Sequence, residues 1–402
     1  MIRVFVLCAA LLAGAPSAGV AENDVVRIDA AQSSMSQNWR GETTLSLGLS
    51  KAVPFRVYTL DTPARLVIDV ANSEWSGADA NELASGSSAV SAIRFGTIRP
   101  GWSRLVADLT EPVLPHDVSM TSNDNGFALL SLRLAKADPE VFAKSSGAPE
   151  TALWPRKEML SSPPSGVSDR FVVVLDPGHG GIDPGAERKG VTEKALMLTF
   201  ARELRSVLQA SGDVDVVMTR EEDVFVSLQA RVAAAHHADA DLFLSLHADA
   251  LTQGGAQGAT VYTLSKDASD AASAQLAARH NRADVLAGID LTGSDDQVTG
   301  VLLDLARQET APRAQAFAHS LAKSLDNAGG PVNRRALRSA GFTVLKSADI
   351  PSVLLEVGFL SSARDLSNLT NPAWRAGIAQ AIDDAIDIWR QQDETRRALL
   401  RQ

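Results

Sequence analysis

The most informative segment of the sequence for the fold is Phe171-Val172-Val173-Val174-Leu175-Asp176-Pro177-Gly178-His179-Gly180-Gly181. Its five consecutive apolar residues are typical of a strand that is buried on both faces of a parallel sheet. The polar and glycine-rich residues that follow mark the end of this strand. In open α/β sheets, functional groups collect just beyond the carboxyl ends of the strands. The stretch therefore predicts an α/β domain with His179 at its functional edge.

The chain after this stretch alternates between strand and helix patterns, as expected for a parallel sheet flanked by helices. Short apolar runs predict strands at 214–218, 242–246, 259–264 and 353–355. Helical spacing of apolar residues predicts helices at 193–210, 226–238 and 374–390. We therefore expect residues 170–392 to form an α/β domain with a mostly parallel, twisted sheet.

Residues 24–136 show a different pattern, with short apolar or half-alternating runs at 44–49, 65–70, 104–109 and 127–134. Turn residues separate these runs, which predicts an all-β sandwich. A weak internal repeat relates 47–54 to 107–114, with an offset of 60 residues (109 minus 49). If the repeat is real, two similar halves form two similar sheets that face each other.

The N-terminus is typical of a secretory signal peptide. Arg3 precedes the short apolar run Val4–Ala13, and small residues follow up to Ala21. We expect cleavage of residues 1–21 and a periplasmic mature protein; the alternative is an N-terminal membrane anchor. The only cysteine, Cys8, lies in this segment. The mature chain would then have no disulfide, and a metal site would need histidines and carboxylates.

The remaining global features limit the possible partners. The length of 402 residues suggests two or three domains. A net charge of −10 argues against nucleic acid as a partner, because phosphate backbones repel an acidic chain. No later stretch is long and apolar enough for an integral membrane segment. Residues 137–169 are rich in Pro, Ser and Gly, which predicts a linker.

Four residues at strand ends or helix starts suggest a hydrolytic metal site: His179, Glu193, His247 and Glu356. Two histidines and one carboxylate are a common zinc set that leaves a fourth position for water. A second carboxylate can take the proton of that water and give it to a leaving amine. On the residues alone, the alternative is that these side chains have structural roles.

Residues 171 to about 390 resemble the zinc-dependent N-acetylmuramoyl-L-alanine amidases of the AmiA/AmiB/AmiC type, which have an amidase-3 catalytic domain. The resemblance rests on VVLDPGHGGIDPGA, Glu193 in GVTEKALML, DLFLSLHADA, and AGFTVLKSADIPSVLLEVGFLSS, in this order. It implies that His179, Glu193 and His247 bind Zn²⁺ and that Glu356 is the catalytic carboxylate. The implied reaction is hydrolysis of the amide between N-acetylmuramic acid and L-alanine, for septal wall splitting during cell division.

The N-terminal part resembles the AMIN domain of such enzymes through LSLGLSKAVPFRV and TPARLVIDV. This resemblance implies a β-sandwich at 24–136 that binds peptidoglycan and helps to place the enzyme at the division site. Relatives that require activation carry a helical insertion over the zinc, which here corresponds to about 267–304. The resemblance implies a LytM-type activator protein as partner. We expect a monomer.

His280 lies in this insertion, at the residue before Asn281. In some relatives, as the resemblance suggests, a glutamate of the insertion takes the open zinc position, and His280 could do the same here because neutral imidazole is a common zinc ligand. The alternative is a surface histidine. An apolar stripe at roughly helical spacing would dock the insertion in a groove; its members are Ala271, Ala274, Leu276, Ala277, Val285 and Leu286.

Two other functions compete with the amidase. One is a zinc deacetylase or peptidase that acts on the same cell-wall material. The other is a non-catalytic peptidoglycan-binding or regulatory protein with an amidase-like domain. The presence of all four predicted site residues argues against the second, since a degenerate domain has no need to keep them.

Overall fold

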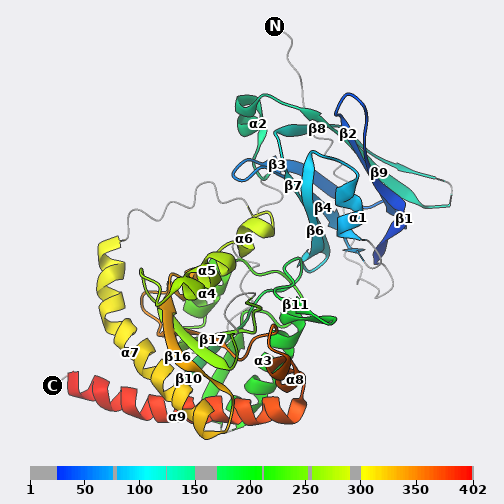
Figure 1. Ribbon diagram of the computed structural model, residues 1–402. Coiled ribbons are helices and arrows are strands. Elements are labelled where there is room, and N and C mark those ends of the chain that lie inside the picture. The colour runs from blue at the N-terminus through cyan, green and yellow to red at the C-terminus, as the bar shows by residue number, and fades with distance from the viewer. Residues whose placement is uncertain are drawn as a thin grey trace, which may run out of the picture.

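The computed structural model describes residues 25–75, 79–123, 125–149, 170–210, 212–251, 256–289 and 300–400. The predicted signal peptide lies outside these residues, as does most of the predicted linker. The described residues form an N-terminal β-sandwich and a C-terminal α/β domain (Figure 1). None of the described helices combines the length and the apolar character needed to cross a membrane.

The N-terminal domain consists of two antiparallel sheets with one short parallel edge pairing. The first sheet has the order β5 (Ser73–Glu74), β1 (Val26–Gln37), β2 (Thr43–Leu49), β9 (Ala128–Lys136) and β8 (Val113–Ser122). The second has the order β3 (Phe55–Leu60), β4 (Arg65–Ala71), β7 (Trp102–Leu109) and β6 (Val90–Arg99). A single apolar cluster with members from both sheets fills the space between them, which confirms the predicted sandwich.

The predicted repeat has a structural counterpart in the way the chain crosses between the sheets. β2, in the first half, belongs to the five-stranded sheet, and the next strand, β3, belongs to the four-stranded sheet. β7, in the second half, belongs to the four-stranded sheet, and β8 belongs to the five-stranded one. The two related segments therefore cross between the sheets in opposite directions, as expected for two halves that face each other.

The N-terminal domain extends further than the sequence predicts. The first part of the predicted linker forms helix α2 (Pro139–Ser145), whose Phe142 is only 1% exposed, and the sandwich also carries helix α1 (Ala80–Ser85). Gly147 N–H donates to Thr59 O at 2.8 Å. One buried aromatic residue is enough to hold a short helix against the sandwich. The linker prediction is therefore corrected for residues 139–148.

The α/β domain has a six-stranded mixed sheet. Its order is β13 (Val214–Met218), β10 (Phe171–Pro177), β14 (Leu242–His247), β17 (Ser352–Glu356), β15 (Ala259–Leu264) and β16 (Val332–Ala340). The first four strands are parallel, whereas β15 runs antiparallel to β17 and parallel to β16. A short hairpin joins β11 (Glu187–Arg188) to β12 (Val191–Thr192).

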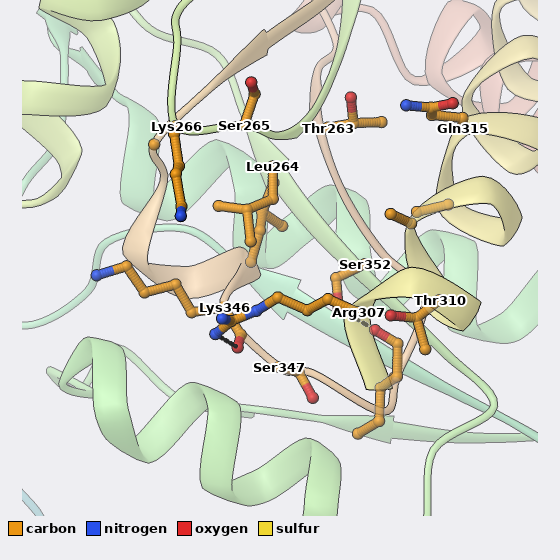
Figure 2. Close-up of a pocket in the computed structure, with 15 residues that line it drawn as sticks. Thr263, Leu264, Ser265, Lys266, Arg307, Thr310, Gln315, Lys346, Ser347 and Ser352 are labelled. Carbon is orange, nitrogen blue, oxygen red and sulfur yellow. Dashed lines mark hydrogen bonds between the residues drawn. The ribbon is translucent and has the colours of Figure 1, made fainter. Parts of the chain in front are cut away.

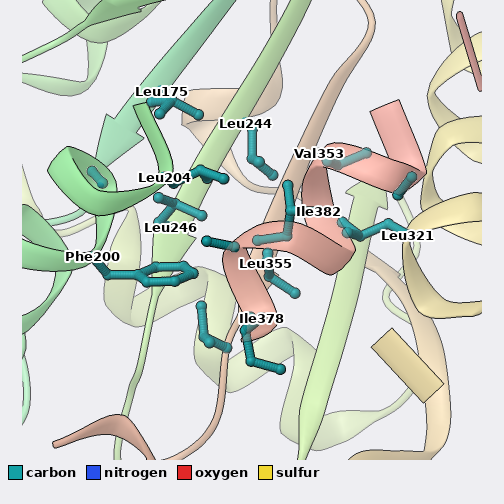
Figure 3. Packing of buried hydrophobic residues seen from close by; sticks show 14 of the residues in the cluster. Leu175, Phe200, Leu204, Leu244, Leu246, Leu321, Val353, Leu355, Ile378 and Ile382 are labelled. Atoms are coloured by element: carbon teal, nitrogen blue, oxygen red, sulfur yellow. The ribbon is translucent and has the colours of Figure 1, made fainter. Parts of the chain in front are cut away.

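Helices cover both faces of this sheet. One face packs on α3 (Glu193–Ala210), α7 (Gly300–Asn327) and α9 (Pro372–Leu400), and Figure 3 shows the apolar side chains of this layer, such as Phe200, Leu246 and Ile382. The other face packs on α4 (Leu228–His237), α5 (Ala271–His280) and the 3₁₀ turn η2 (Thr343–Leu345). Two short helices, α6 (Ala283–Leu286) and α8 (Ala363–Leu369), complete the domain.

The predicted helical insertion at about 267–304 is not one continuous helix. It contains two helices, α5 and α6, and its last predicted residues already belong to α7; residues 290–299 lie outside the described part of the chain. Ser273, Leu276, Ala277 and His280 form the buried face of α5, whereas the predicted Ala271 and Ala274 are exposed. The chain turns between α5 and α6, so Val285 and Leu286 do not continue the same helical face.

Candidate metal centre

The sheet itself brings three of the predicted site residues together. β10, β14 and β17 are neighbouring parallel strands, so their carboxyl ends meet at one edge. His247 and Glu356 are direct partners in the register of β14 and β17. His179 follows β10 after one glycine. Directly paired residues of parallel strands point to the same side, so His247 and Glu356 lie together, and the loop after β10 brings the ring of His179 beside that of His247.

The loop after β10 depends on glycine at Gly178. A Cβ atom there would lie 2.2 Å from Cε1 of His247, which is far inside van der Waals contact. His179 itself has a positive φ of 60°, which aims its ring back over the sheet edge. The ring centroids of His179 and His247 lie 5.0 Å apart.

Glu193, the first residue of α3, lies between the two histidines. Its Oε1 is 3.0 Å from His247 Nδ1, and its Oε2 is 3.2 Å from His179 Nε2. Backbone N–H groups of Ala186 and Ala248 also donate to this fully buried carboxylate. These contacts orient Glu193 so that one oxygen faces each ring.

Two acidic residues that the sequence reasoning did not single out complete the site. Asp183 Oδ2 lies 2.8 Å from His179 Nδ1, a contact that fixes the ring and its tautomer as in many zinc sites. Asp249 donates its backbone N–H to Glu356 Oε2 at 2.9 Å. Both lie inside the motifs DPGHGGID and SLHADA, and the four-residue spacing of His179 and Asp183 was the available signal.

His280, at the end of α5, lies over this centre. Its ring centroid is 4.3 Å from that of His247 and 5.8 Å from that of His179. Its Nε2 is 3.3 Å from Asp249 Oδ2 and 3.8 Å from Glu356 Oε1. With only 5% of its surface exposed, His280 is not the surface residue of the alternative interpretation.

The donor atoms fit a metal ion. One potential ligand atom from each of His179, His247 and His280 lies within 4.8 Å of the other two, and the same holds for Asp249, His280 and Glu356. Among the described residues, His179 Nε2 and Glu356 Oε1 are buried polar atoms without a hydrogen-bond partner. Buried polar atoms rarely lack partners, so these two suit a ligand between them. Imidazole nitrogen and carboxylate oxygen are donors that zinc accepts.

The charges of the site follow from its burial. Burial opposes the charge on Glu193, yet the charge of His179 and the close contacts of this carboxylate with both histidines hold the pKa of Glu193 well below its ordinary value. Burial lowers the pKa of His247 to about 4, and His280 acts in the same direction, so His247 stays neutral as a ligand must. Glu193 and Asp183 overcome burial to raise the pKa of His179 well above its ordinary value; a bound dication would displace that proton.

Glu356 behaves differently from Glu193. Burial, together with the charges of Asp249 and Glu193, raises the pKa of Glu356 well above its ordinary value. A carboxylate with a raised pKa is a better proton acceptor than an ordinary one at neutral pH. The pKa of Glu193 is lowered, which suits a charged metal ligand, whereas the pKa of Glu356 is raised, which suits a proton acceptor.

The space at the centre is nearly closed. The cavity between His179, His247, His280 and Phe342 measures about 20 Å³, enough for about one water molecule but not for a substrate. A larger cavity of about 440 Å³ lies between α7 and the segment before β17, lined in part by Lys266, Arg307 and Lys346 (Figure 2). None of the predicted site residues lines this larger cavity.

Comparisons with known proteins agree with this geometry. Residues 173–387 match the family described as N-acetylmuramoyl-L-alanine amidase, and residues 16–72 match the AMIN-like domain family. N-acetylmuramoyl-L-alanine amidase AmiC of Neisseria meningitidis is 33% identical over 376 residues, which cover 86% of each chain. AmiC of Escherichia coli is 30% identical over 85% of this chain and 84% of its own. AmiA of Escherichia coli is 41% identical over 54% of this chain and 74% of its own.

Proposed function

Because the chain belongs to the N-acetylmuramoyl-L-alanine amidase family, we propose that it holds one zinc ion with His179, Glu193 and His247 and uses Glu356 as its catalytic base. The reaction of the family is hydrolysis of the amide between N-acetylmuramic acid and L-alanine in peptidoglycan. The observation that carries the zinc proposal is the contact of Glu193 with both histidines, beside the unpaired Oε1 of Glu356.

Each residue of the site would have a separate role in the hydrolysis. Zinc, when bound, would lower the pKa of a coordinated water to about 7 and polarise the scissile carbonyl. Glu356 would take the proton of the water through Oε1 and give it to the leaving amine nitrogen. Asp183 would hold His179 with its Nε2 lone pair directed at the centre. The backbone N–H of Asp249 would keep Glu356 Oε2 in place, so that Oε1 alone handles the proton.

The site would be closed in the resting enzyme. We use "lid" for residues 271–289, which comprise α5, α6 and the turn after α6. His280 of the lid lies above the proposed ligands, with Asp249 and Glu356 as its nearest acidic neighbours. The cavity below it is too small for a peptidoglycan strand. The lid must therefore move before substrate binds, and a LytM-type activator protein would be the partner that moves it.

The remaining parts of the proposal concern location. The predicted signal peptide would direct the chain to the periplasm, where peptidoglycan is found. The AMIN-like domain would bind peptidoglycan and raise the local concentration of the catalytic domain on its polymer. The names AmiA and AmiC of the relatives are consistent with a role in septal splitting during cell division.

Metal analysis tests the ligand set. Purified protein should contain one zinc per chain, and His179→Ala should lose it while the circular dichroism spectrum is unchanged. His319→Ala is the matched control, because His319 is exposed on α7 and should leave the zinc content unchanged. Full zinc occupancy in His179→Ala would refute the assignment.

A further inference from the structure

Three arginines of the N-terminal sandwich reach the lid, although they lie 183 to 220 residues away from their acceptors in the sequence. All three donate hydrogen bonds to backbone carbonyls in the last turn of α6 and just beyond it. The contacts are Arg65 Nη1 to Val285 O (2.7 Å), Arg94 Nε to Leu286 O (3.1 Å), and Arg104 Nη1 to Ala287 O (3.2 Å) and Gly288 O (2.9 Å). Figure 1 shows α6 at the junction of the two domains.

The carbonyls at the end of α6 can accept hydrogen bonds from outside the lid, although Val285 O also accepts from Gly288 N–H within it at 3.0 Å. The last carbonyls of any helix have no partner within the helix, and they carry partial negative charge. α6 has only four residues and therefore little stability of its own. Hydrogen bonds from a charged guanidinium are stronger than neutral ones. The position of α6 should therefore depend strongly on these arginines.

Two of the arginines are held in place by carboxylates of their own domain. Arg104 makes two hydrogen bonds to the buried Asp69, at 2.6 and 3.0 Å. Arg94 makes two to Asp108, both at 2.7 Å. Each pairing fixes the plane of the guanidinium, so that the remaining N–H groups point at α6 without further loss of side-chain freedom.

An apolar contact supports the polar one. Ala287 of the lid is buried in a small cluster with Ile98 and Val106 of the sandwich and with Ile182 and Phe225 of the catalytic domain. This cluster is separate from the core of the sandwich.

The turn after α6 fits closely against the sandwich. Gly288 has a φ of +67°, and a Cβ atom there would lie 2.9 Å from Val106 Cγ2. The backbone of the lid can approach β7 this closely only because the residue is glycine.

The same face of the sandwich also touches the loop that carries His179. Ile182 N–H donates to Thr97 O of β6 at 3.0 Å, three residues after His179. β6 therefore contacts the proposed ligand loop through Thr97 and the lid through Arg94. The sandwich therefore contacts both the loop that carries His179 and the lid.

We propose that the AMIN-like domain restrains the lid, so that the resting enzyme is closed by the N-terminal domain as well as by α5. This inference rests on the proposed function, in which the lid blocks the zinc site. The lid also has an anchor in its own domain, since Asp284 Oδ1 accepts from Leu228 N at 2.9 Å. Separation of the two domains leaves only the intradomain contacts and shifts the lid towards its open state.

The test uses full-length protein and two variants of the sandwich. Arg94→Met removes a donor but keeps an apolar side chain of similar length, and Ile98→Ala removes side-chain volume from the small cluster without touching the core of the sandwich. Arg133→Met is the matched control, because Arg133 is a half-exposed arginine of β9 that pairs with Asp117 within the sandwich. Circular dichroism and thermal unfolding check that each variant is folded.

The first readout is hydrogen exchange of the lid amides at residues 271–289, which requires neither substrate nor zinc. Exchange from a locally opened state follows the opening equilibrium. We expect about a tenfold increase for Arg94→Met and about 30-fold or more for Ile98→Ala, with no change for Arg133→Met. The second readout is dye release from labelled sacculi, which should rise in the same order.

The outcomes separate the restraint from the proposed function. Faster lid exchange with no gain in dye release supports the restraint and contradicts the lid as the block to activity. Unchanged lid exchange in both folded variants overturns the restraint by the N-terminal domain. The block of the zinc site by the lid would then be tested by variants within α5 alone. Equal changes in Arg133→Met and Arg94→Met would also overturn it, because the effect would then not come from the contact with α6.

Discussion

Leu276→Ala should open the closed enzyme without an activator. Leu276 is the most deeply buried apolar side chain of α5, and it packs with Phe342, Tyr262 and Leu354 on the face of the sheet. A buried leucine truncated to alanine costs about 2–5 kcal/mol. The closed state bears this cost, whereas the open state, in which α5 has left the sheet, does not.

The size of the effect follows from this difference. Each 1.4 kcal/mol changes an equilibrium constant about tenfold, so the ratio of open to closed lid should rise about 30-fold to several thousand-fold. Dye release by the zinc-loaded enzyme should rise by the same factor until most molecules are open. Above that point the rate is limited by chemistry, and an activator should add nothing further.

Two controls separate lid opening from general destabilisation. Leu204→Ala truncates an equally buried leucine in α3, within the other core layer, and should lower the melting temperature without raising basal activity. Ala274→Glu changes an exposed residue of α5 itself and should leave both unchanged. A folded, zinc-loaded Leu276→Ala variant that is no more active alone than the wild type would show that α5 does not block the site.

Four further predictions concern the site, its support and the N-terminal domain. Glu356→Gln should keep its zinc and lose about 10²–10⁴ in turnover, because an amide cannot accept the proton; near-normal turnover by dye release would assign the base elsewhere. His280→Ala should raise basal activity less than Leu276→Ala does, since part of what it removes is a polar contact that water can replace once the lid is open, and no rise at all would exclude the imidazole as part of the block. Asp176→Asn should cost about 3–5 kcal/mol in urea unfolding at pH 7, because it leaves the buried Arg231 without its ion pair. Although burial opposes the charge of Asp176, Arg231 and the hydroxyls of Thr219 and Ser245 hold the pKa of this carboxyl below its ordinary value. The stability that the charge contributes is therefore present above about pH 4 and is lost as the pH falls through the folded-state pKa. The penalty of Asp176→Asn should shrink in acid, and a penalty that does not depend on pH would contradict the ion-pair explanation. A fragment of residues 24–149 has its own core and should bind purified sacculi without hydrolysing them, whereas absence of retention in a pull-down would refute a peptidoglycan-binding role.

The sequence predicted those parts of the fold where local pattern and tertiary environment agree. α3 has the predicted bounds, because its apolar residues repeat at helical spacing from Leu196 to Leu208 and all face the core. β10 and β14 were predicted because strands buried on both faces read as apolar runs. The convergence of His179, His247 and Glu356 followed from one rule, the common edge of parallel strands.

Two long elements of the α/β domain, β16 and α7, were not predicted, for identifiable reasons. β16 is an edge strand with the sequence VNRRALRSA, and it has no apolar run because one side faces solvent. α7 contains Pro312 in its interior, which usually ends a helix. The spacing of Ala314, Phe317, Leu321 and Leu325 was the available signal for its buried face.

The contact between the domains could not have been predicted from residue patterns. The acceptors on α6 are backbone carbonyls, which every residue carries, so no sequence feature distinguishes them. The donors, such as Arg65 and Arg104, lie in strands whose alternation indicates only that they belong to a sheet. In α5, Leu276 and Ala277 are buried as predicted, whereas Ala271 and Ala274 are exposed, because small alanines fit several helical faces equally well.

The zinc ligands can be identified by anomalous diffraction at the zinc absorption edge, from crystals of the full-length protein grown with zinc. We predict one strong peak about 2.0–2.2 Å from a ring nitrogen of His179, a carboxylate oxygen of Glu193 and a ring nitrogen of His247. Glu356 should lie outside bonding distance of this peak. A peak bound instead by Asp249, His280 and Glu356, or no peak at all from folded protein crystallised with excess zinc, would contradict the proposed ligand set.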